Sequence, residues 1–256
     1  MINGIILDLD GTVYWGESEV PGAASFVRRF KAHGGRCLFV TNRANRTPRT
    51  VCAHLYQYGI ICEEKDVLTS AEVTVQHLKQ GRVYLIGEEG MRVALEEAGF
   101  ILTDTQPDYV VISFDRAFNY AKLATACRLI QEGARLVATN PDRYLRTHDG
   151  IVPGTGAILA AVVAGSDAKP LVIGKPEPLI LLAALQRLDL SKAEVISVGD
   201  NLETDVPSGA KAGIRTVLML TGVSKREQVE KAPVRPTWVV DGYEGLWEIV
   251  SRENRW

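Results

Sequence analysis

Short apolar runs alternate along the chain with longer segments whose apolar residues recur every three or four positions. The short runs are typical of buried strands and the longer segments of amphipathic helices, so their alternation predicts an α/β fold built on a parallel sheet. The expected strands are 4–9, 36–41, 83–86, 109–112, 135–138, 171–173, 194–198, 216–219 and 238–240. The expected helices include 22–33, 47–58, 71–79, 120–132 and 178–188.

Two breaks rich in small and turn-forming residues interrupt this pattern, at 80–81 and at 165–170. They predict an inserted domain over 81–170, placed between two halves of a first domain, 1–80 and 171–256. Such an arrangement suits an enzyme in which one part holds the reactive groups and the other closes over them.

Two carboxylates follow the first strand almost at once, in the sequence "IILDLDGT". Asp8 and Asp10 stand one residue apart, and like charges this close repel each other unless something offsets them. Because ligands of open parallel sheets bind beyond the carboxyl ends of the strands, the pair is expected at the functional edge.

Three further strands are followed by polar side chains at the same edge. These are Thr41, Asn42 and Arg43, then Lys175, then Asp200, Asn201 and Asp205. Clustered carboxylates indicate a Mg²⁺ site, since this ion prefers oxygen ligands. A threonine hydroxyl and a lysine suit the oxygens of a phosphoryl group. Together they predict phosphoryl transfer through an aspartyl-phosphate.

The ordered motifs "DLDGT", "TN", "GKP" and "GDNLETD" span nearly the whole chain. In this order they resemble the haloacid dehalogenase (HAD) superfamily, in its phosphatase branch. The long segment with "ATNPD" and "PGTGA" before the lysine motif is similar to that of the NagD-type phosphatases, which carry a large α/β cap of the second class there. The resemblance implies a Rossmann-like core in 1–80 and 171–256, with a cap in 81–170.

The resemblance also implies a role for each motif residue. Asp8 would be the nucleophile and Asp10 the general acid and then base. Asp8, the backbone carbonyl of Asp10, and Asp200 would hold Mg²⁺. The remaining motif residues would surround the phosphoryl group: Thr41 and Lys175 bind it, Asn42 and Asn201 lie around it, and Asp205 orients Lys175 or a metal-bound water.

Arg43 departs from the small residue that is usual after "TN" in this family. Its guanidinium either reaches the substrate or caps a solvated loop. In the inserted segment, a loop carrying Arg143, Arg146 and His148 is the expected place where the leaving group is recognised. The proline that usually follows "NPD" is absent there.

Composition excludes several other classes. A net charge of -2 gives no reason to expect nucleic acid or an anionic membrane as partner. The four cysteines include no C-x-x-C pair, and the longest apolar run, 157–164, is too short to span a bilayer. The expectation is a cytoplasmic protein that acts on a small phosphorylated metabolite, with self-association into a dimer left open.

The function predicted from these features is Mg²⁺-dependent hydrolysis of small phosphomonoesters, such as sugar phosphates, nucleotides, phosphoglycolate or aryl phosphates. A phosphotransferase or phosphomutase of the same superfamily is an alternative, although the segment 13–19 is too short for the cap that mutases generally carry after the first strand. A receiver-like phosphoacceptor module is a second alternative, but such modules are about half as long.

Overall fold

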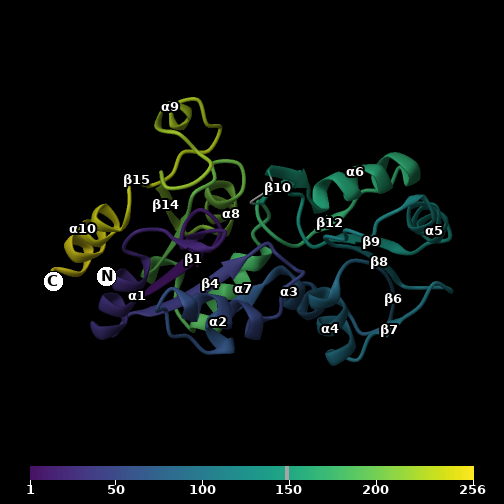
Figure 1. The fold of residues 1–256 in the computed structure, drawn as a ribbon, viewed down its shortest axis with the longest axis horizontal. Coiled ribbons are helices and arrows are strands. Elements are labelled where there is room, and N and C mark those ends of the chain that lie inside the picture. Colours follow the sequence, from purple (N-terminus) through teal and green to yellow (C-terminus); the bar gives the residue numbers. More distant parts are fainter. Residues whose placement is uncertain (148–149) are drawn as a thin grey trace. The chain divides into compact units, whose positions relative to one another are not determined.

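The computed structural model describes residues 1–147 and 150–256. Its contacts divide the chain into two compact units. The core unit comprises Met1–Thr41, Pro48–Leu68 and Lys175–Trp256, and the inserted unit comprises Asn42–Thr47 and Thr69–Gly174. Each unit is an α/β structure with its own parallel sheet (Figure 1). The fold class expected from the sequence is confirmed.

The core unit contains a six-stranded sheet in the order β15-β14-β13-β1-β4-β5. Its strands are β1 (Gly4–Asp8), β4 (Arg36–Thr41), β5 (Val67–Thr69), β13 (Val195–Gly199), β14 (Arg215–Met219) and β15 (Trp238–Val240). The central strand β1 is parallel to both its neighbours, β4 and β13. The chain builds the sheet outward from β1 in one direction and then in the other, so the strand order reverses at β1, which is the switch point of a doubly wound sheet.

Burial on both faces explains why the strands of this sheet are almost wholly apolar. Ile5 and Leu7 pack in one core cluster with Phe26 and Phe30 of α1 (Ala23–Ala32), while Ile6, on the opposite face, is also buried. The other helices of the core unit are α2 (Pro48–Gln57), α7 (Leu179–Leu188), α8 (Asp205–Ala212), α9 (Arg226–Val229) and α10 (Tyr243–Asn254), with short 3₁₀ turns η1 (Glu64–Asp66) and η2 (Lys192–Glu194). A small antiparallel hairpin, β2 (Tyr14–Trp15) with β3 (Ser18–Glu19), follows β1.

The inserted unit has a five-stranded sheet in the order β12-β9-β8-β6-β7. Its strands are β6 (Arg82–Ile86), β7 (Ile101–Leu102), β8 (Tyr109–Ile112), β9 (Arg135–Ala138) and β12 (Leu171–Val172), and its helices are α3 (Ser70–His77), α4 (Glu89–Glu97), α5 (Tyr120–Gln131) and α6 (Thr155–Ser166). The chain first contributes Asn42–Thr47 to this unit, although the sequence places these residues in the core. Helix α3 packs against α4, so the main part of the unit begins at Thr69, about one helix before the break at 80–81 that the sequence suggests. The return at Lys175 lies just after the second break.

The segment expected to be a loop around Arg143–His148 is instead largely a strand. β10 (Tyr144–Thr147) pairs antiparallel with β11 (Gly150–Pro153), with Thr147 opposite Gly150. The loop prediction is therefore wrong for 144–147. The sequence does contain a weak hairpin signal, the turn-forming pair Asp149-Gly150 after the β-prone run 144–147.

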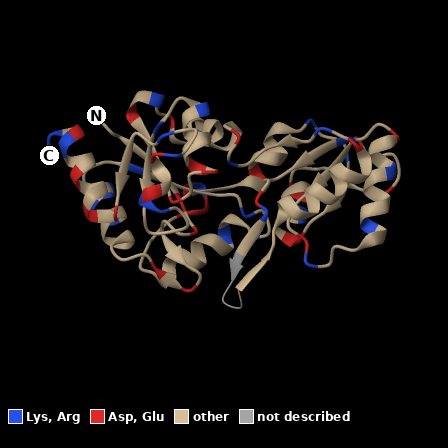
Figure 2. Cartoon of the chain, turned by 90° about the horizontal axis from the view of Figure 1, so that it is seen from above, with Lys and Arg blue, Asp and Glu red and all other residues tan. Residues whose placement is uncertain are grey.

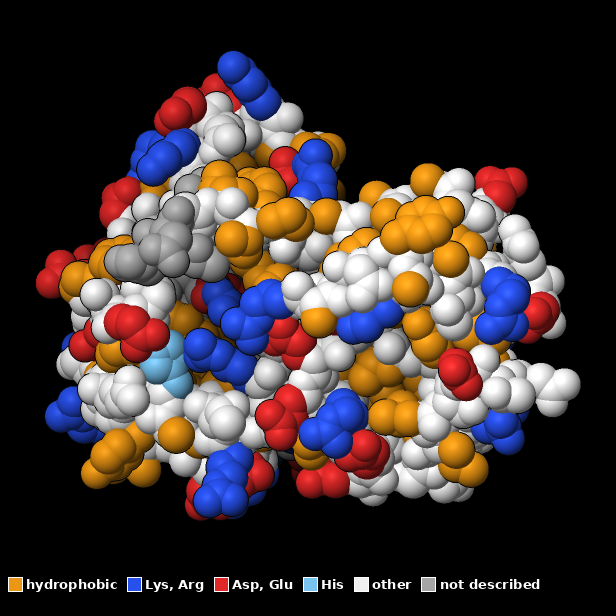
Figure 3. All heavy atoms as spheres, turned by 45° about the vertical axis from the view of Figure 1, so that its right-hand side comes forward, with side chains coloured by type: hydrophobic (Ala, Val, Ile, Leu, Met, Phe, Trp, Pro, Cys, Tyr) orange, Lys and Arg blue, Asp and Glu red, His pale blue; other side chains and the backbone are white. Residues whose placement is uncertain are grey.

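Charges are distributed over both units without separation by sign. Figure 2 shows Lys and Arg intermingled with Asp and Glu along the helices and loops, and on the face seen in Figure 3 hydrophobic side chains lie among charged ones. This distribution agrees with the net charge of -2. Within the described residues, no helix is long and apolar enough to cross a bilayer.

Candidate active site

The carboxylates of the first strand lie at the switch point of the core sheet. In the register of β1 with β13, Leu7 pairs with Val198, so Asp8 and Asp200 leave adjacent strands at almost the same height. Each of Asp8, Asp200 and Asp205 offers a carboxylate oxygen, and these oxygens lie within 4.8 Å of one another. Two strands far apart in the sequence and the first residue of helix α8 thus bring three acids to one point.

A buried lysine joins two of these acids. The Nζ atom of Lys175 donates one hydrogen bond to Oδ1 of Asp8 and another, of 2.6 Å, to Oδ1 of Asp205. The three side chains are only 5%, 11% and 6% exposed, respectively. The other oxygen of Asp205 accepts from the backbone N–H of Asn201 at 3.1 Å. Asp205 opens helix α8, where the helix dipole also favours a negative charge.

Burial and mutual repulsion disturb the ionisation of this group. Burial raises the pKa of Asp8 well above its ordinary value; Lys175 opposes the rise, and the charges of Asp205 and Asp200 add to it. Burial, followed by the charge of Asp205, raises the pKa of Asp200 from 3.8 to about 7. Burial alone would lower the pKa of Lys175, but Asp205 and Asp8 raise it above its ordinary value. Three carboxylates against one ammonium leave an excess of negative charge.

This donor set fits a small divalent cation. Carboxylate oxygens are the ligands that Mg²⁺ prefers, and a doubly charged ion would offset the excess negative charge. Two glycines leave room around Asp200: a Cβ on Gly11 or on Gly222 would collide with its carboxylate. The side chain of Asp10 does not belong to this cluster among the described residues.

The structure places the other residues of the core motifs as follows. Thr41 ends β4 and is buried, one residue beyond Val40, which pairs with Asp8. Asn201 follows Asp200, and its side-chain oxygen accepts from the backbone N–H of Glu203 at 2.8 Å, so this oxygen is used within its own turn. Asp10 begins the turn after β1 and forms an isolated bridge with Tyr14 of β2.

Asn42 belongs to the inserted unit, where its side chain contacts a second motif. Its Nδ2 donates to the two carboxylate oxygens of Asp142 at 3.1 and 3.2 Å. Its carbonyl accepts from Ser70 Oγ at 2.6 Å and from Asn140 Nδ2 at 2.8 Å. The "TNPD" segment of the inserted unit therefore fixes the residue that directly follows Thr41.

The arginines expected to recognise the leaving group are only partly described. Arg43 is half-buried in the inserted unit, and Arg143 is exposed just before β10. Arg146 lies within β10, and its side chain is outside what the structure describes. His148 lies outside the described residues.

Sequence reasoning missed the loop "TGVS" after β14, residues 221–224. The backbone N–H of Val223 donates to Oδ2 of Asp200 at 2.7 Å, and the N–H of Ser224 donates to its carbonyl at 3.2 Å. The hydroxyl of Thr221 donates to the carbonyl of Gly11 at 2.6 Å. The available signal was small and polar residues directly after a strand of the same sheet.

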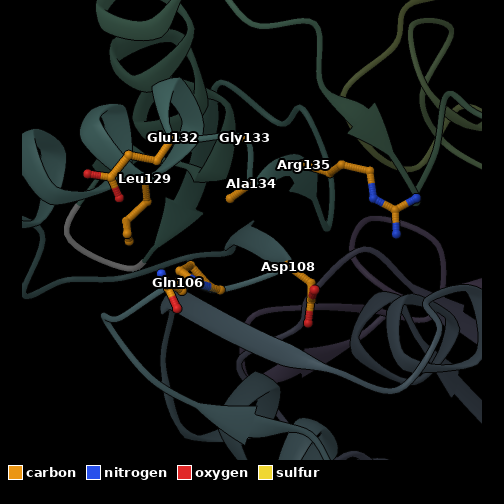
Figure 4. Close-up of a pocket in the computed structure, with 8 residues that line it drawn as sticks. Gln106, Asp108, Leu129, Glu132, Gly133, Ala134 and Arg135 are labelled. Carbon is orange, nitrogen blue, oxygen red and sulfur yellow. The ribbon is translucent and has the colours of Figure 1, made fainter.

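A cavity of about 490 Å³ lies within the inserted unit (Figure 4). It is lined by Gln106, Pro107, Asp108, Leu129, Glu132, Gly133, Ala134 and Arg135, at the amino ends of β8 and β9. Its charged groups already have partners: Asp108 accepts from the N–H of Arg82 at 2.7 Å, Arg135 bonds the hydroxyl of Tyr109, and Glu132 pairs with Arg128. Nothing in this cavity suggests catalysis.

Taken together, the doubly wound sheet and the acid cluster with its lysine define an α/β protein with a candidate active site at the switch point of its core sheet. Two family models match the chain: haloacid dehalogenase-like hydrolase over residues 5–101 and HAD-hydrolase-like over residues 172–246. The chain belongs to the haloacid dehalogenase-like hydrolases, as a phosphatase of the NagD type, and it acts on phosphoric monoesters.

Relatives match this chain over nearly its whole length. The 5'-nucleotidase YutF of Bacillus subtilis is 39% identical over 242 residues, 93% of this chain and 94% of that protein. The structure of NagD from E. coli K-12 is 32% identical with a TM-score of 0.89, covering 95% of this chain and 97% of the other. A glycerol phosphate phosphatase from Mycobacterium tuberculosis, solved with magnesium, is 32% identical with a TM-score of 0.89, covering 96% of this chain and 76% of the other.

Proposed function

We propose that this protein is a Mg²⁺-dependent phosphatase that hydrolyses small phosphomonoesters through a phosphorylated Asp8. The observation that supports this most directly is the bond from Lys175 to Asp8, formed beside Asp200 at the switch point of the sheet. A buried carboxylate held by a lysine is positioned to attack, and the same lysine can then bind the phosphoryl oxygens.

The proposed reaction has two steps. In the first, a carboxylate oxygen of Asp8 forms a bond to phosphorus while the bond from phosphorus to the leaving oxygen breaks, and Asp10 gives that oxygen a proton. In the second, Asp10 takes a proton from water, whose oxygen attacks the phosphorus and releases phosphate and the free Asp8. Lys175 and Thr41 hold the phosphoryl oxygens throughout. Mg²⁺, held by Asp8, Asp200 and the carbonyl of Asp10, would neutralise phosphoryl charge.

We assign the recognition of the leaving group to the inserted unit, acting as a cap. Arg43, Arg143 and Arg146 are the candidate residues, with Asn42 and Asn201 beside the phosphoryl group. The names of two relatives, a 5'-nucleotidase and a glycerol phosphate phosphatase, favour nucleotides and polyol phosphates as the first compounds to assay. Sugar phosphates, phosphoglycolate and aryl phosphates complete the panel.

The nucleophile is tested with Asp8→Asn, whose amide cannot attack phosphorus. We expect kcat for p-nitrophenyl phosphate to fall by more than about a thousandfold. Asp241→Asn is the matched control, because Asp241 is an exposed acid of the core unit paired with Arg226. Retention of substantial turnover by Asp8→Asn would remove Asp8 from this role.

The metal is tested by chelation and replacement. Exhaustive treatment with EDTA should abolish turnover, and Mg²⁺ should restore it. Ca²⁺ should restore it poorly, because its larger and looser coordination can engage both oxygens of the nucleophile. Full activity in EDTA would exclude the proposed metal.

Leaving-group recognition is tested with alanine variants of Arg43, Arg143 and Arg146. Each variant should raise KM for the best natural substrate by an amount that corresponds to roughly 1.5–3 kcal/mol, the value of a charge-assisted hydrogen bond. Hydrolysis of a small aryl phosphate should change little. An equal loss on both substrates would mean that these arginines serve the phosphoryl site or the fold.

A further inference from the structure

We propose that Thr221 is a positioning residue that fixes the turn carrying Asp10. The proposal rests on the function proposed above, in which Asp10 protonates the leaving group. The hydroxyl of Thr221 donates to the carbonyl of Gly11, the residue directly after Asp10, at 2.6 Å. The carbonyl of Thr221 in turn accepts from Nε1 of Trp15 at 2.6 Å. Thr221 is thus fastened to both ends of the segment 11–15.

The turn itself needs such a fastening. Gly11 has a φ of 82°, in the left-handed region that side chains disfavour, and its N–H bonds the carbonyl of Tyr14 at 2.8 Å. These internal bonds close the turn, but they do not attach it to the rest of the site. The bonds to Thr221 attach it to the loop after β14, which is two strands away from β1 in the sheet.

The same loop binds the other side of the site. Val223 donates its N–H to the carboxylate of Asp200 at 2.7 Å, and Gly222 lies close enough that a Cβ there would collide with that carboxylate. One four-residue loop, 221–224, therefore sets the position of the Asp10 turn relative to Asp200. The Thr221 side chain contacts the Asp10 turn, whereas the Val223 backbone contacts Asp200. A substitution of the Thr221 side chain can therefore remove the first contact and leave the second.

The placement of Asp10 matters for its proposed role. A general acid must lie within about 2.6–3.2 Å of the oxygen that it protonates. A displacement of about 1 Å can cost about a hundredfold in rate. Loss of the Thr221 hydroxyl should therefore slow reactions whose leaving group needs a proton, and should matter little where the leaving group is already a weak base.

The experiment compares Thr221→Val, Thr221→Ser and the matched control Thr216→Val. Thr216 lies near the start of β14, at the opposite end of the strand from the loop 221–224. Its hydroxyl accepts from the N–H of Thr237 at 3.2 Å. We expect Thr221→Val to lower kcat for glycerol phosphate about tenfold and for p-nitrophenyl phosphate less than about threefold, as an acid defect requires. Thr221→Ser should be close to wild type, and Thr216→Val should show no difference between the two substrates.

Metal affinity supplies a readout that does not depend on turnover. Titration calorimetry with Mg²⁺ should give a weaker affinity for Thr221→Val than for wild type, because the carbonyl of Asp10, a proposed ligand, moves with the turn, while Val223 still holds Asp200. Trp15→Phe removes the indole N–H together with part of the ring, at a position that is 45% exposed, and should show the same substrate difference, but smaller. It provides a test even if Thr221→Val does not fold.

Equal losses on both substrates, or an unchanged Mg²⁺ affinity in Thr221→Val, would overturn the proposal, as would a Trp15→Phe variant without any substrate difference. Asp10→Asn, assayed in parallel, separates this failure from a failure of the proposed function. If Asp10→Asn slows both substrates equally, the acid role of Asp10 is wrong. If it shows the substrate difference and Thr221→Val does not, only the positioning role is wrong.

Discussion

Replacing Asp200 with asparagine should stabilise the metal-free protein above neutral pH. Asp200 is 4% exposed, and burial together with the charge of Asp205 raises its pKa from 3.8 to about 7. The amide of Asp200→Asn can still accept the N–H of Val223, which lies 2.7 Å from the carboxylate. The substitution therefore removes a buried negative charge that is repelled by Asp205, and it retains the hydrogen bond.

The sign of the pH dependence follows from the proton that each state holds. In the unfolded chain Asp200 ionises near pH 3.8, whereas in the folded protein it ionises near pH 7. Between these values the folded protein keeps a proton that the unfolded chain has lost, so stability falls as the pH rises across this window, and the loss is complete above pH 7. A pKa difference of this size corresponds to at most about 4 kcal/mol.

For a chain of this length, about 1 kcal/mol shifts Tm by roughly 2–4 °C. In EDTA at pH 8, Asp200→Asn should therefore melt several degrees above wild type, with an upper bound of roughly 15 °C. Near pH 4 the two should melt at almost the same temperature. Asp241→Asn, whose carboxylate is 83% exposed, is the control and should show no such gain at pH 8.

Mg²⁺ should narrow the difference between the two proteins at pH 8. At a hundred times its Kd, a ligand of the folded state adds about 2.7 kcal/mol to stability. Wild type should gain this increment, and Asp200→Asn should gain much less. Thermal unfolding followed by circular dichroism, in EDTA and in Mg²⁺ at both pH values, measures all of these differences. Equal melting temperatures of wild type and Asp200→Asn in EDTA at pH 8 would refute the reasoning.

Three further predictions concern other parts of the chain. Asp142→Ala removes the contacts of 3.1 and 3.2 Å to Asn42 and should raise KM several-fold, with Asp142→Asn intermediate; unchanged steady-state kinetics would contradict this. Trp256→Ala loses the stacking on Trp247, with ring centroids 5.6 Å apart, worth about 0.5–1.5 kcal/mol, so calorimetry should show a lower Tm and not an unchanged one. Burial raises the pKa of Cys37 to about 12, so Ellman's reagent should label this thiol only after unfolding, and rapid labelling of the native protein at Cys37 would disprove its burial.

The sequence predicted most strands of the two sheets well, because burial on both faces leaves a continuous apolar run, although it missed the short strand β5. The segments 36–41, 109–112 and 135–138 agree with β4, β8 and β9 to the residue. The meeting of Asp8 and Asp200 was also predictable, since each stands at the carboxyl end of a strand of one sheet. The same reasoning was wrong for Lys175, because the strand before it, β12, belongs to the sheet of the inserted unit. The catalytic roles of all three residues remain predictions.

The features that the sequence did not predict depend on weak or distant signals. The strands of the β10–β11 hairpin are four residues each, too short for alternation to distinguish them from a loop. The role of the loop after β14 depends on backbone groups of Val223 and Gly11, which no residue type reveals. The boundary at Thr69 depends on the packing of α3 against α4, and the amino-acid composition of α3 does not predict which unit this helix joins.

The central position of β1 has a consequence for biosynthesis. This strand leaves the ribosome before the main part of the inserted unit, and its neighbour β13 only after it. The strands of the inserted unit find their partners within one continuous stretch, since β6, β8, β9 and β12 pair among themselves. We therefore expect the inserted unit to fold first on the ribosome. Until β13 is made, the edge of β1 that pairs with it keeps its backbone N–H and C=O groups unpaired. That interval is when the nascent chain is most exposed to aggregation and has most need of a chaperone.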